Sequence, residues 1–237
     1  MQTRWPETRW HVARDMDDWL ARARARVSHA EAEALDQRGE FHIVLAGGNT
    51  PARLYRALAG EAHDWARWQI WLGDERCLGD TDPGRNSVMV TASLLQQDDT
   101  RAAGFHPIPA HQGAMAGARA YADALADIGL FDLVLLGLGE DGHTASLFPG
   151  QDWGTAPGSP DALPIYQAPK PPAERISLSA QRLSRARQVL FLVTGRDKQA
   201  ALGRWQAGEA IPASAICPPG GVDVLLDPES LSTGATP

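Results

Sequence analysis

The sequence predicts a doubly wound α/β fold, in which a mainly parallel sheet carries helices on both faces. Two observations support this class. Short, continuous apolar runs alternate along the chain with segments of helical period, and the runs lack the polar alternation of a strand exposed on one side. No repeat, low-complexity tract or linker divides the sequence, so we expect a single α/β domain over residues 1–237.

The strand and helix candidates follow one another in a regular order. Residues 15–38 have helical spacing and stop at Gly39, and Pro51 suits the first turn of a helix over residues 51–60. Further helices are expected from about Asn86 and near residues 113–129. The strand candidates are residues 41–46, 68–73, 131–138, 188–195 and 222–227, with 175–179 weaker. The Pro- and Gly-rich residues 149–172 are expected to form a surface loop.

Charge and cysteine content exclude several classes of protein. The chain has 22 Lys and Arg against 29 Asp and Glu, a net charge of −7, which argues against nucleic acid or an anionic membrane as the main partner. Cys77 and Cys217 have no paired spacing, so neither a disulfide framework nor a cysteine zinc site is expected. With no signal peptide or membrane span evident, we predict a cytoplasmic protein that is a monomer or weak homo-oligomer.

Polar and glycine-bearing segments follow four of the predicted strands. They are Gly47-Gly48-Asn49-Thr50, Asp74-Glu75-Arg76-Cys77, residues 139–144 (GEDGHT) and residues 195–198 (GRDK). In open α/β sheets ligands bind outside the carboxyl ends of the strands. The shared position of these segments therefore predicts one binding site at that edge of the sheet.

The first of these segments has the character of an anion-binding turn. Gly47 and Gly48 let the backbone approach a ligand closely, and the N–H groups of the following helix suit a phosphate. The alternative is an ordinary strand-to-helix turn. Lys198 is a candidate point charge for the same phosphate, although a single lysine is usually a solvated surface group.

The second segment allows two interpretations. Asp74, Glu75 and Arg76 either solvate a loop or, together with Asn86, bind sugar hydroxyls and orient a catalytic group. The nearby acidic residues do not have the spacing of a calcium loop, and no glutamate closes such a loop. We therefore predict no metal site here.

The third segment begins with the pattern G-x-G-x-x-G (residues 137–142), which is typical of dinucleotide-binding proteins. Such a fingerprint normally follows the first strand of its unit and has an acidic residue about 20 positions further on. Here it follows a later strand, and Glu140 and Asp141 would meet the pyrophosphate with negative charge. We therefore expect no nicotinamide site.

His143, on the same turn, is the strongest candidate for catalysis. Imidazole suits general-base chemistry near neutral pH, and a nearby carboxylate, Glu140 or Asp141, can fix its tautomer. The alternative is a helix-capping or core histidine. Ser146 lacks the G-x-S-x-G context of a serine hydrolase. Six histidines lack a comparable setting and are interpreted as structural or surface residues: His11, His29, His42, His63, His106 and His111.

These segments together resemble the 6-phosphogluconolactonase family, which is related to glucosamine-6-phosphate deaminase and ribose-5-phosphate isomerase. The resemblance runs nearly end to end, and residues 131–150 are its most specific segment, with the signature DGHTASLFP at residues 141–149. Further matching segments are residues 45–58, 71–87, 175–179, 192–202 and 211–216.

The resemblance implies a role for each matching residue. It implies that His143 is the general base, with Asp141 beside it, and that no cofactor is needed. It further implies a phosphate loop with two cationic partners and a sugar pocket. The phosphate loop would be Gly47, Gly48, Asn49 and Thr50, its partners Arg175 and Lys198, and the pocket residues Asp74, Glu75, Arg76 and Asn86. Two departures from the family pattern are that Asn49 stands where serine is usual and that Arg85-Asn86-Ser87 replaces the commoner Ser-Asn-Tyr.

The expected activity is hydrolysis of a phosphosugar lactone, 6-phospho-D-glucono-1,5-lactone, by base-activated water. Two alternatives stay open at this point. One is an enzyme like glucosamine-6-phosphate deaminase, which needs an extra carboxylate for proton transfer. After His143 no acid occurs before Asp152, which favours the lactonase. The other is a non-catalytic sugar-phosphate-binding protein, in which loss of the base would be expected.

Overall fold

Seven parallel strands form the central sheet. The computed structural model describes residues 7–231. The strand order is β1-β10-β9-β6-β2-β3-β5, and every neighbouring pair is parallel, which confirms the predicted fold class. The strands are β1 (Thr8–Val12), β2 (Phe41–Leu45), β3 (Trp68–Leu72), β5 (Gly104–His106), β6 (Phe131–Leu136), β9 (Ala186–Val193) and β10 (Val222–Leu226).

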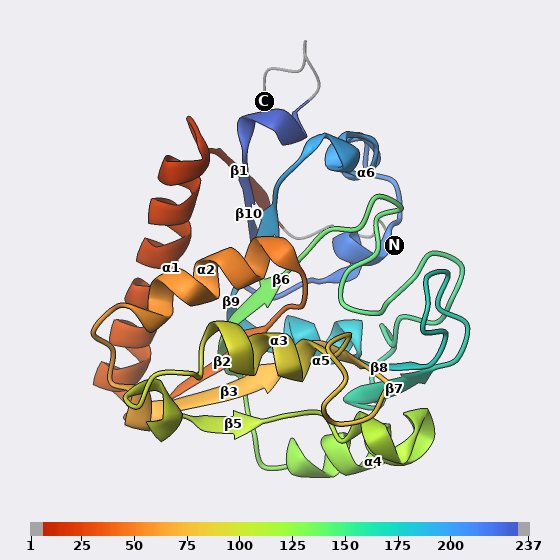
Figure 1. Cartoon of the computed structure of the whole chain (residues 1–237). Helices are drawn as coiled ribbons and strands as arrows, with labels where there is room; N and C mark the ends of the chain where they lie inside the picture. Colours follow the sequence, from red (N-terminus) through yellow and green to blue (C-terminus); the bar gives the residue numbers. More distant parts are fainter. Residues whose placement is uncertain (1–6, 232–237) are drawn as a thin grey trace.

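Six α-helices connect the strands of residues 7–231 (Figure 1). From β1 to β5 the chain steps through β2 and β3 toward one sheet edge, and from β6 to β10 it steps toward the other. Because parallel crossovers are right-handed, the first three helices cover one face and the last three the opposite face. The helices are α1 (Met16–Arg38), α2 (Asn49–Ala59), α3 (Asn86–Ser93), α4 (Ala114–Ala124), α5 (Ala180–Ser184) and α6 (Gln199–Gln206).

The direction of winding reverses between β2 and β6, which are neighbours in the sheet. Loops that leave adjacent strands at such a point run to opposite faces and leave a crevice between them. The loop after β2 carries Gly47 and Gly48, and the loop after β6 carries His143. The topology therefore brings two of the segments singled out in the sequence to one place.

A small antiparallel sheet, with strand order β4-β8-β7, flanks the large one. It consists of β4 (Asp74–Arg76), β7 (Ala162–Ile165) and β8 (Arg175–Leu178). The weaker strand candidate, residues 175–179, is confirmed as β8. The interpretation of residues 74–77 and 149–172 as loops alone is wrong, because each contains a short strand paired with β8.

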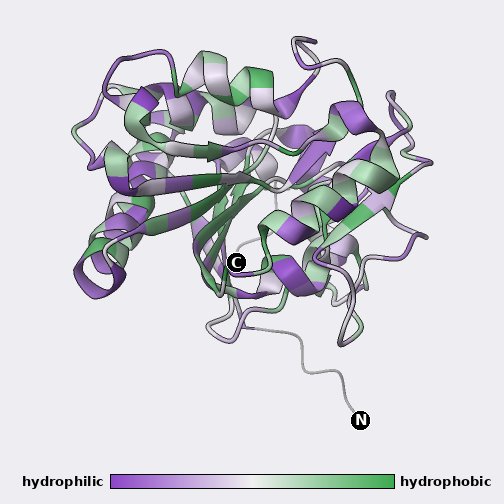
Figure 2. Ribbon diagram, turned by 90° about the horizontal axis from the view of Figure 1, so that it is seen from below, coloured by the Kyte–Doolittle hydropathy of each residue, from purple (hydrophilic) through white to green (hydrophobic). Residues whose placement is uncertain are grey.

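Apolar side chains between the sheet and its helices form the core. In Figure 2 the hydrophobic strands lie between helices that turn hydrophilic residues outward. All six residues of β6 are buried, the five apolar residues as predicted and Asp132 with them. Helix α1 begins after Asp15, which accepts a hydrogen bond from Asp18 N–H, and ends at Gly39 in the left-handed conformation. Within residues 7–231 no helix has the length and apolar character that crossing a bilayer requires.

A buried carboxylate ties α1 to the start of β3. Glu31 Oε2 lies 2.5 Å from His63 Nδ1, and its Oε1 accepts a 2.7 Å hydrogen bond from Trp68 Nε1. Burial alone raises the pKa of Glu31, but these two partners and the N–H of Asp64 outweigh it, so the pKa is lowered. The ionised form of Glu31 therefore stabilises the fold.

Glu31→Gln is expected to lower the free energy of unfolding at pH 7 by about 1–3 kcal/mol, since it removes the charge from a buried hydrogen-bonded cluster. A lowered folded-state pKa contributes stability above the ordinary value of 4.5, which is lost as the pH falls through the folded-state pKa. The difference between the variant and the wild type should therefore shrink below about pH 4.5. Urea unfolding from pH 7 to pH 4 measures it. The exposed Asp36 on the same helix supplies the control Asp36→Asn, and equal losses in both variants would contradict the prediction.

Candidate active site

A cavity of about 190 Å³ opens where the loops after β2 and β6 meet. Most of its lining comes from the segments that follow the strands of the large sheet, and two further residues come from the start of β8 and the loop before it. The lining residues are Ala46, Gly47, Gly48, Asp74, Arg76, Asn86, Gly137, Leu138, Gly139, Glu140, His143, Ala145, Lys170, Arg175 and Lys198. Eight of the twelve predicted site residues are among them, so the structure brings these eight together at one edge of the sheet.

A larger hollow of about 630 Å³ lies beside α3 and β5. Apolar side chains such as Val88, Phe105 and Ile108 contribute most of its surface. None of the twelve predicted site residues lines it, although Arg85 does. Size alone therefore does not identify the functional site, and the smaller cavity with its convergent polar groups is the better candidate.

The turn after β2, at Gly47 and Gly48, presents backbone without side chains to the cavity. Gly48 has a φ of 108°, a conformation that favours glycine, and directly precedes the first residue of α2. A Cβ atom on Gly47 would lie 2.0 Å from Asn86 Oδ1, so only glycine fits there. The first N–H groups of a helix have no partner within it, and the turn therefore offers an anion site.

The turn after β6 fixes the histidine. His143 Nδ1 lies 2.5 Å from Asp141 Oδ1, and the same oxygen accepts a 3.1 Å hydrogen bond from His143 N–H. Gly139 N–H donates to the His143 carbonyl at 2.8 Å, and a Cβ on Gly139 would lie 2.0 Å from Nδ1. Within the described part of the chain, Nε2 has no hydrogen-bond partner. The ring is thus held through one nitrogen and leaves the other available in the cavity.

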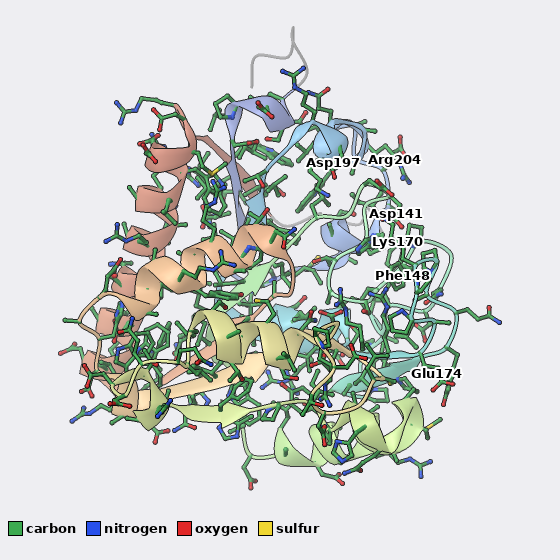
Figure 3. All side chains as sticks on the ribbon, viewed as in Figure 1. Asp141, Phe148, Lys170, Glu174, Asp197 and Arg204 are labelled. Atoms are coloured by element: carbon green, nitrogen blue, oxygen red, sulfur yellow. The ribbon has the colours of Figure 1, made fainter. Side chains whose placement is uncertain are left out.

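Asp141 is held as an ionised partner of this ring. Burial raises the pKa of its carboxyl, but the hydrogen bond from His143 N–H and the interaction with the ring outweigh burial, so the pKa is lowered. Arg204 Nη1, from α6, donates to the Asp141 carbonyl at 3.2 Å. Figure 3 shows Arg204 and Asp197 near Asp141, with Lys170 and Phe148 on the same side of the molecule.

Four cationic side chains line the cavity, and three are the predicted Arg76, Arg175 and Lys198. Arg175 is buried and donates to the carbonyls of Pro172 and Lys170 at 3.1 and 2.8 Å. Burial lowers the pKa of its guanidinium, and the nearby charge of Asp74 works against that shift. Lys198 Nζ lies 2.6 Å from Asp197 Oδ2.

The fourth cation, Lys170, was not predicted. Its Nζ lies 2.7 Å from Glu140 Oε1, which also lines the cavity. The hydrogen bond to Glu140 raises the pKa of the Lys170 ammonium. Lys170 lies in the Pro-rich segment that was interpreted only as a surface loop. A lysine between prolines was the one local signal that could have drawn attention to it.

Glu75 does not line the cavity, so its assignment to the sugar pocket is wrong. Its side chain is completely buried, and Oε1 accepts hydrogen bonds from the N–H groups of Arg76 and Asn86 at 2.8 and 2.7 Å. Oε2 accepts one from Ser87 N–H at 2.8 Å. Glu75 caps the N-terminus of α3, where a carboxylate is stabilising. Asp74 and Asn86, in contrast, line the cavity.

Asn49 and Thr50 also lie outside the cavity lining. Asn49 is exposed at the start of α2, and Thr50 Oγ1 lies 2.6 Å from Thr194 Oγ1. Their side chains point to other partners or to solvent, which corrects the expectation that they line the site. Participation of their backbone N–H groups in a phosphate loop stays a prediction.

The described residues contain no group of three or more His, Cys, Asp or Glu side chains placed to hold a metal ion. The histidine turn and the glycine turn instead combine a fixed imidazole with an anion site. Together, fold and cavity define an α/β protein whose site suits base-assisted chemistry on a small anionic ligand.

Comparison with known proteins gives the family. The model for glucosamine-6-phosphate isomerases/6-phosphogluconolactonase matches residues 14–225, and the chain belongs to this family. A 6-phosphogluconolactonase of Synechocystis sp. is 38% identical over 224 residues, covering 89% of this chain and 92% of the relative. The GDH/6PGL endoplasmic bifunctional protein of Oryctolagus cuniculus is 38% identical over 194 residues, or 77% of this chain, which spans only 24% of that relative.

Solved structures agree with this membership. A crystal structure of a 6-phosphogluconolactonase from Shewanella baltica superposes with a TM-score of 0.83 at 28% identity, covering 93% of this chain and 98% of that one. A 6-phosphogluconolactonase from Thermotoga maritima gives a TM-score of 0.84 over 93% of this chain and all of that one. At 22% identity the second structure shows the shared fold alone.

Gly47→Ala is expected to weaken ligand binding, because the added Cβ would displace either the turn or the Asn86 amide. We expect an increase in KM of about tenfold or more, equivalent to a loss of about 1.4 kcal/mol of binding. Steady-state kinetics measure it. Gly129→Ala is the control, since a Cβ there meets no atom within 4 Å. An unchanged KM in Gly47→Ala would contradict the close packing of this turn.

Proposed function

We propose that the chain hydrolyses 6-phospho-D-glucono-1,5-lactone to 6-phosphogluconate, a step of the oxidative pentose phosphate pathway, by general-base activation of water. One observation carries the proposal. His143 has Nδ1 fixed by Asp141 and Nε2 available in a cavity that also contains the glycine turn and Lys198. The names and similarity of the family members support the choice of substrate.

The reaction needs few groups, because a lactone is already an activated ester. His143 Nε2 takes a proton from water as the water oxygen attacks the C1 carbonyl. The tetrahedral intermediate then collapses with cleavage of the bond between C1 and the ring oxygen. His143 returns its proton to that oxygen, which leaves as the C5 hydroxyl. Asp141 stabilises the imidazolium that forms between the two steps.

Different parts of the cavity bind the phosphate of the substrate and its carbonyl oxygen. The phosphate binds at the turn of Gly47 and Gly48, with Lys198 beside it. Arg175, the first residue of β8, was predicted as a second partner of the phosphate; we assign it instead, with Lys170 of the preceding loop, to the negative charge that develops on the carbonyl oxygen. Asp74 and Asn86 accept hydrogen bonds from sugar hydroxyls. No cofactor takes part in this sequence of steps.

The deaminase alternative depends on whether a carboxylate in the cavity can transfer protons. Two carboxylates, Asp74 and Glu140, do enter the cavity, although no acid closely follows His143 in the chain. Both already have partners: Asp74 accepts hydrogen bonds from Ser146 and Asn86, and Glu140 pairs with Lys170. A carboxylate engaged in this way is poorly placed to carry protons between adjacent carbons. We therefore favour the lactonase.

A non-catalytic sugar-phosphate-binding protein is the second alternative. It would need the anion turn but not a fixed imidazole. The Asp141–His143 pair and the glycine packed against its ring argue for a working base instead.

One experiment separates the three functions. Freshly generated 6-phosphogluconolactone is followed by proton release, and glucosamine 6-phosphate is followed by ammonia release. Lactone loss above the spontaneous rate without ammonia supports the lactonase. Ammonia release supports the deaminase. Binding of 6-phosphogluconate without either reaction supports the binding protein.

His143→Asn is expected to lower kcat by about 10²- to 10⁴-fold, the usual contribution of a general base. Binding of 6-phosphogluconate, measured by calorimetry, should change little because the phosphate turn is intact. His29→Asn, which alters an exposed histidine on α1, is the control. A wild-type kcat in His143→Asn would reject His143 as the base.

Lys198→Ala is expected to raise KM for the phosphorylated lactone by about tenfold or more, because a charge-assisted hydrogen bond is lost. Hydrolysis of unphosphorylated glucono-1,5-lactone should be unaffected. Arg196→Ala changes an exposed cation in the same turn and serves as the control. If both substrates lose activity equally, Lys198 does not act on the phosphate.

The proposal includes a cytoplasmic location and a monomer or weak homo-oligomer. Cys77 and Cys217 are both free thiols, as expected in a reducing compartment.

A further inference from the structure

A buried serine lies directly behind the cavity wall, between the histidine turn and β4. Ser146 is completely buried and does not line the cavity. Its Oγ donates a 2.6 Å hydrogen bond to Asp74 Oδ2, and Ser177 Oγ accepts a 3.2 Å hydrogen bond from its N–H. Ser146 thus contacts a residue of the cavity wall and cannot reach a ligand itself.

The second oxygen of Asp74 is held from another side. Asn86 Nδ2 donates to Asp74 Oδ1 at 3.0 Å and to the Asp74 carbonyl at 2.9 Å, so both hydrogens of this amide are used. A carboxylate has about four acceptor positions, and Asp74 uses one on each oxygen for these contacts. Its remaining acceptor positions are available to the cavity that it lines.

The same short turn carries both the histidine and the serine. Ala145 has a φ of 48°, in the left-handed region that is uncommon for a residue with a side chain. Thr144 Oγ1 donates to the Gly137 carbonyl at 2.9 Å and so ties the turn to the end of β6. Residues 143–146 therefore set the place of the imidazole and of the hydroxyl that holds Asp74.

We infer that Ser146 is a positioning residue that fixes the Asp74 carboxylate as a hydrogen-bond acceptor for the sugar hydroxyls of the substrate. This inference rests on the proposed lactonase function and adds to it. Ser146 acts on substrate binding through Asp74, whereas His143 acts on the chemical step. The turn of residues 143–146 carries both residues and so fixes the imidazole relative to the Asp74 carboxylate.

Ser146→Ala is expected to raise KM for 6-phosphogluconolactone by about tenfold, because Asp74 is left with one unsatisfied oxygen and is no longer fixed. Its kcat should stay within about twofold of wild type, the pattern of an interaction made equally in ground and transition state. Ser93→Ala is the matched control, since Ser93 is a buried serine whose hydroxyl donates to the Met89 carbonyl at 2.7 Å.

A double-mutant cycle separates positioning from a general structural effect. In an Asp74→Ala background, adding Ser146→Ala should raise KM by less than about twofold, because the residue through which Ser146 acts is gone. A loosened turn would instead lower kcat through His143, and it would do so in both backgrounds. Should Ser146→Ala not fold, Ser146→Cys keeps the shape with a weaker donor and should give a smaller rise in KM.

Two outcomes overturn the inference while leaving the proposed function standing. One is an unchanged KM in Ser146→Ala, and the other is the same rise in KM with and without Asp74. Absence of lactone hydrolysis by the wild-type chain is a different result, which rejects the proposed function and this inference with it.

Discussion

The buried carboxylate of Glu75 accepts hydrogen bonds from the backbone of β4 and from the first N–H groups of α3. Arg85 Nε, which lies 3.4 Å from Oε2, adds a charged partner. These contacts fix the start of α3 against the small sheet, and Asn86 is the first residue of that helix. The amide of Asn86 in turn packs on Gly47 and holds Asp74. One carboxylate outside the cavity therefore positions the glycine turn relative to Asp74, and this part of the cavity wall depends on it.

The switch point explains why the histidine turn and the glycine turn meet. The strands that precede them are neighbours, yet they are far apart in the chain, and their loops turn to opposite faces of the sheet. Each turn uses glycine for a separate reason. Gly48 supplies a positive φ, while Gly47 and Gly139 leave space that the side chains of Asn86 and His143 occupy. The packing of the site thus requires glycine at these positions as well as the side chains of Asn86 and His143.

Sequence patterns predicted the buried strands and the histidine turn well, because continuous apolar runs and glycine-bearing strand ends are local signals. They failed where a strand is short, polar or at a sheet edge, as with β1, β4, β5 and β7. Three consecutive charges at residues 74–76 gave no indication that Glu75 turns inward to a helix terminus. Lys170 and Arg204 reach the site only through tertiary folding, from segments distant in the chain. The sequence alone therefore did not determine the direction of individual side chains or the contacts between segments that are distant in the chain.

The pairing of charges around the cavity has a consequence for turnover. Four cationic side chains line it, Arg76, Lys170, Arg175 and Lys198, against two anionic ones, Asp74 and Glu140. Two of the four cations are already paired, Lys170 with Glu140 and Lys198 with Asp197, in a chain whose net charge is −7. Hydrolysis of a lactone creates a carboxylate, so the product of the proposed reaction has one more negative charge than the substrate. In the proposed reaction that extra charge forms at the carbonyl carbon, beside Arg175 and Lys170. The product of the proposed reaction therefore leaves against the attraction of the cations that bound the substrate, and these cations slow its release.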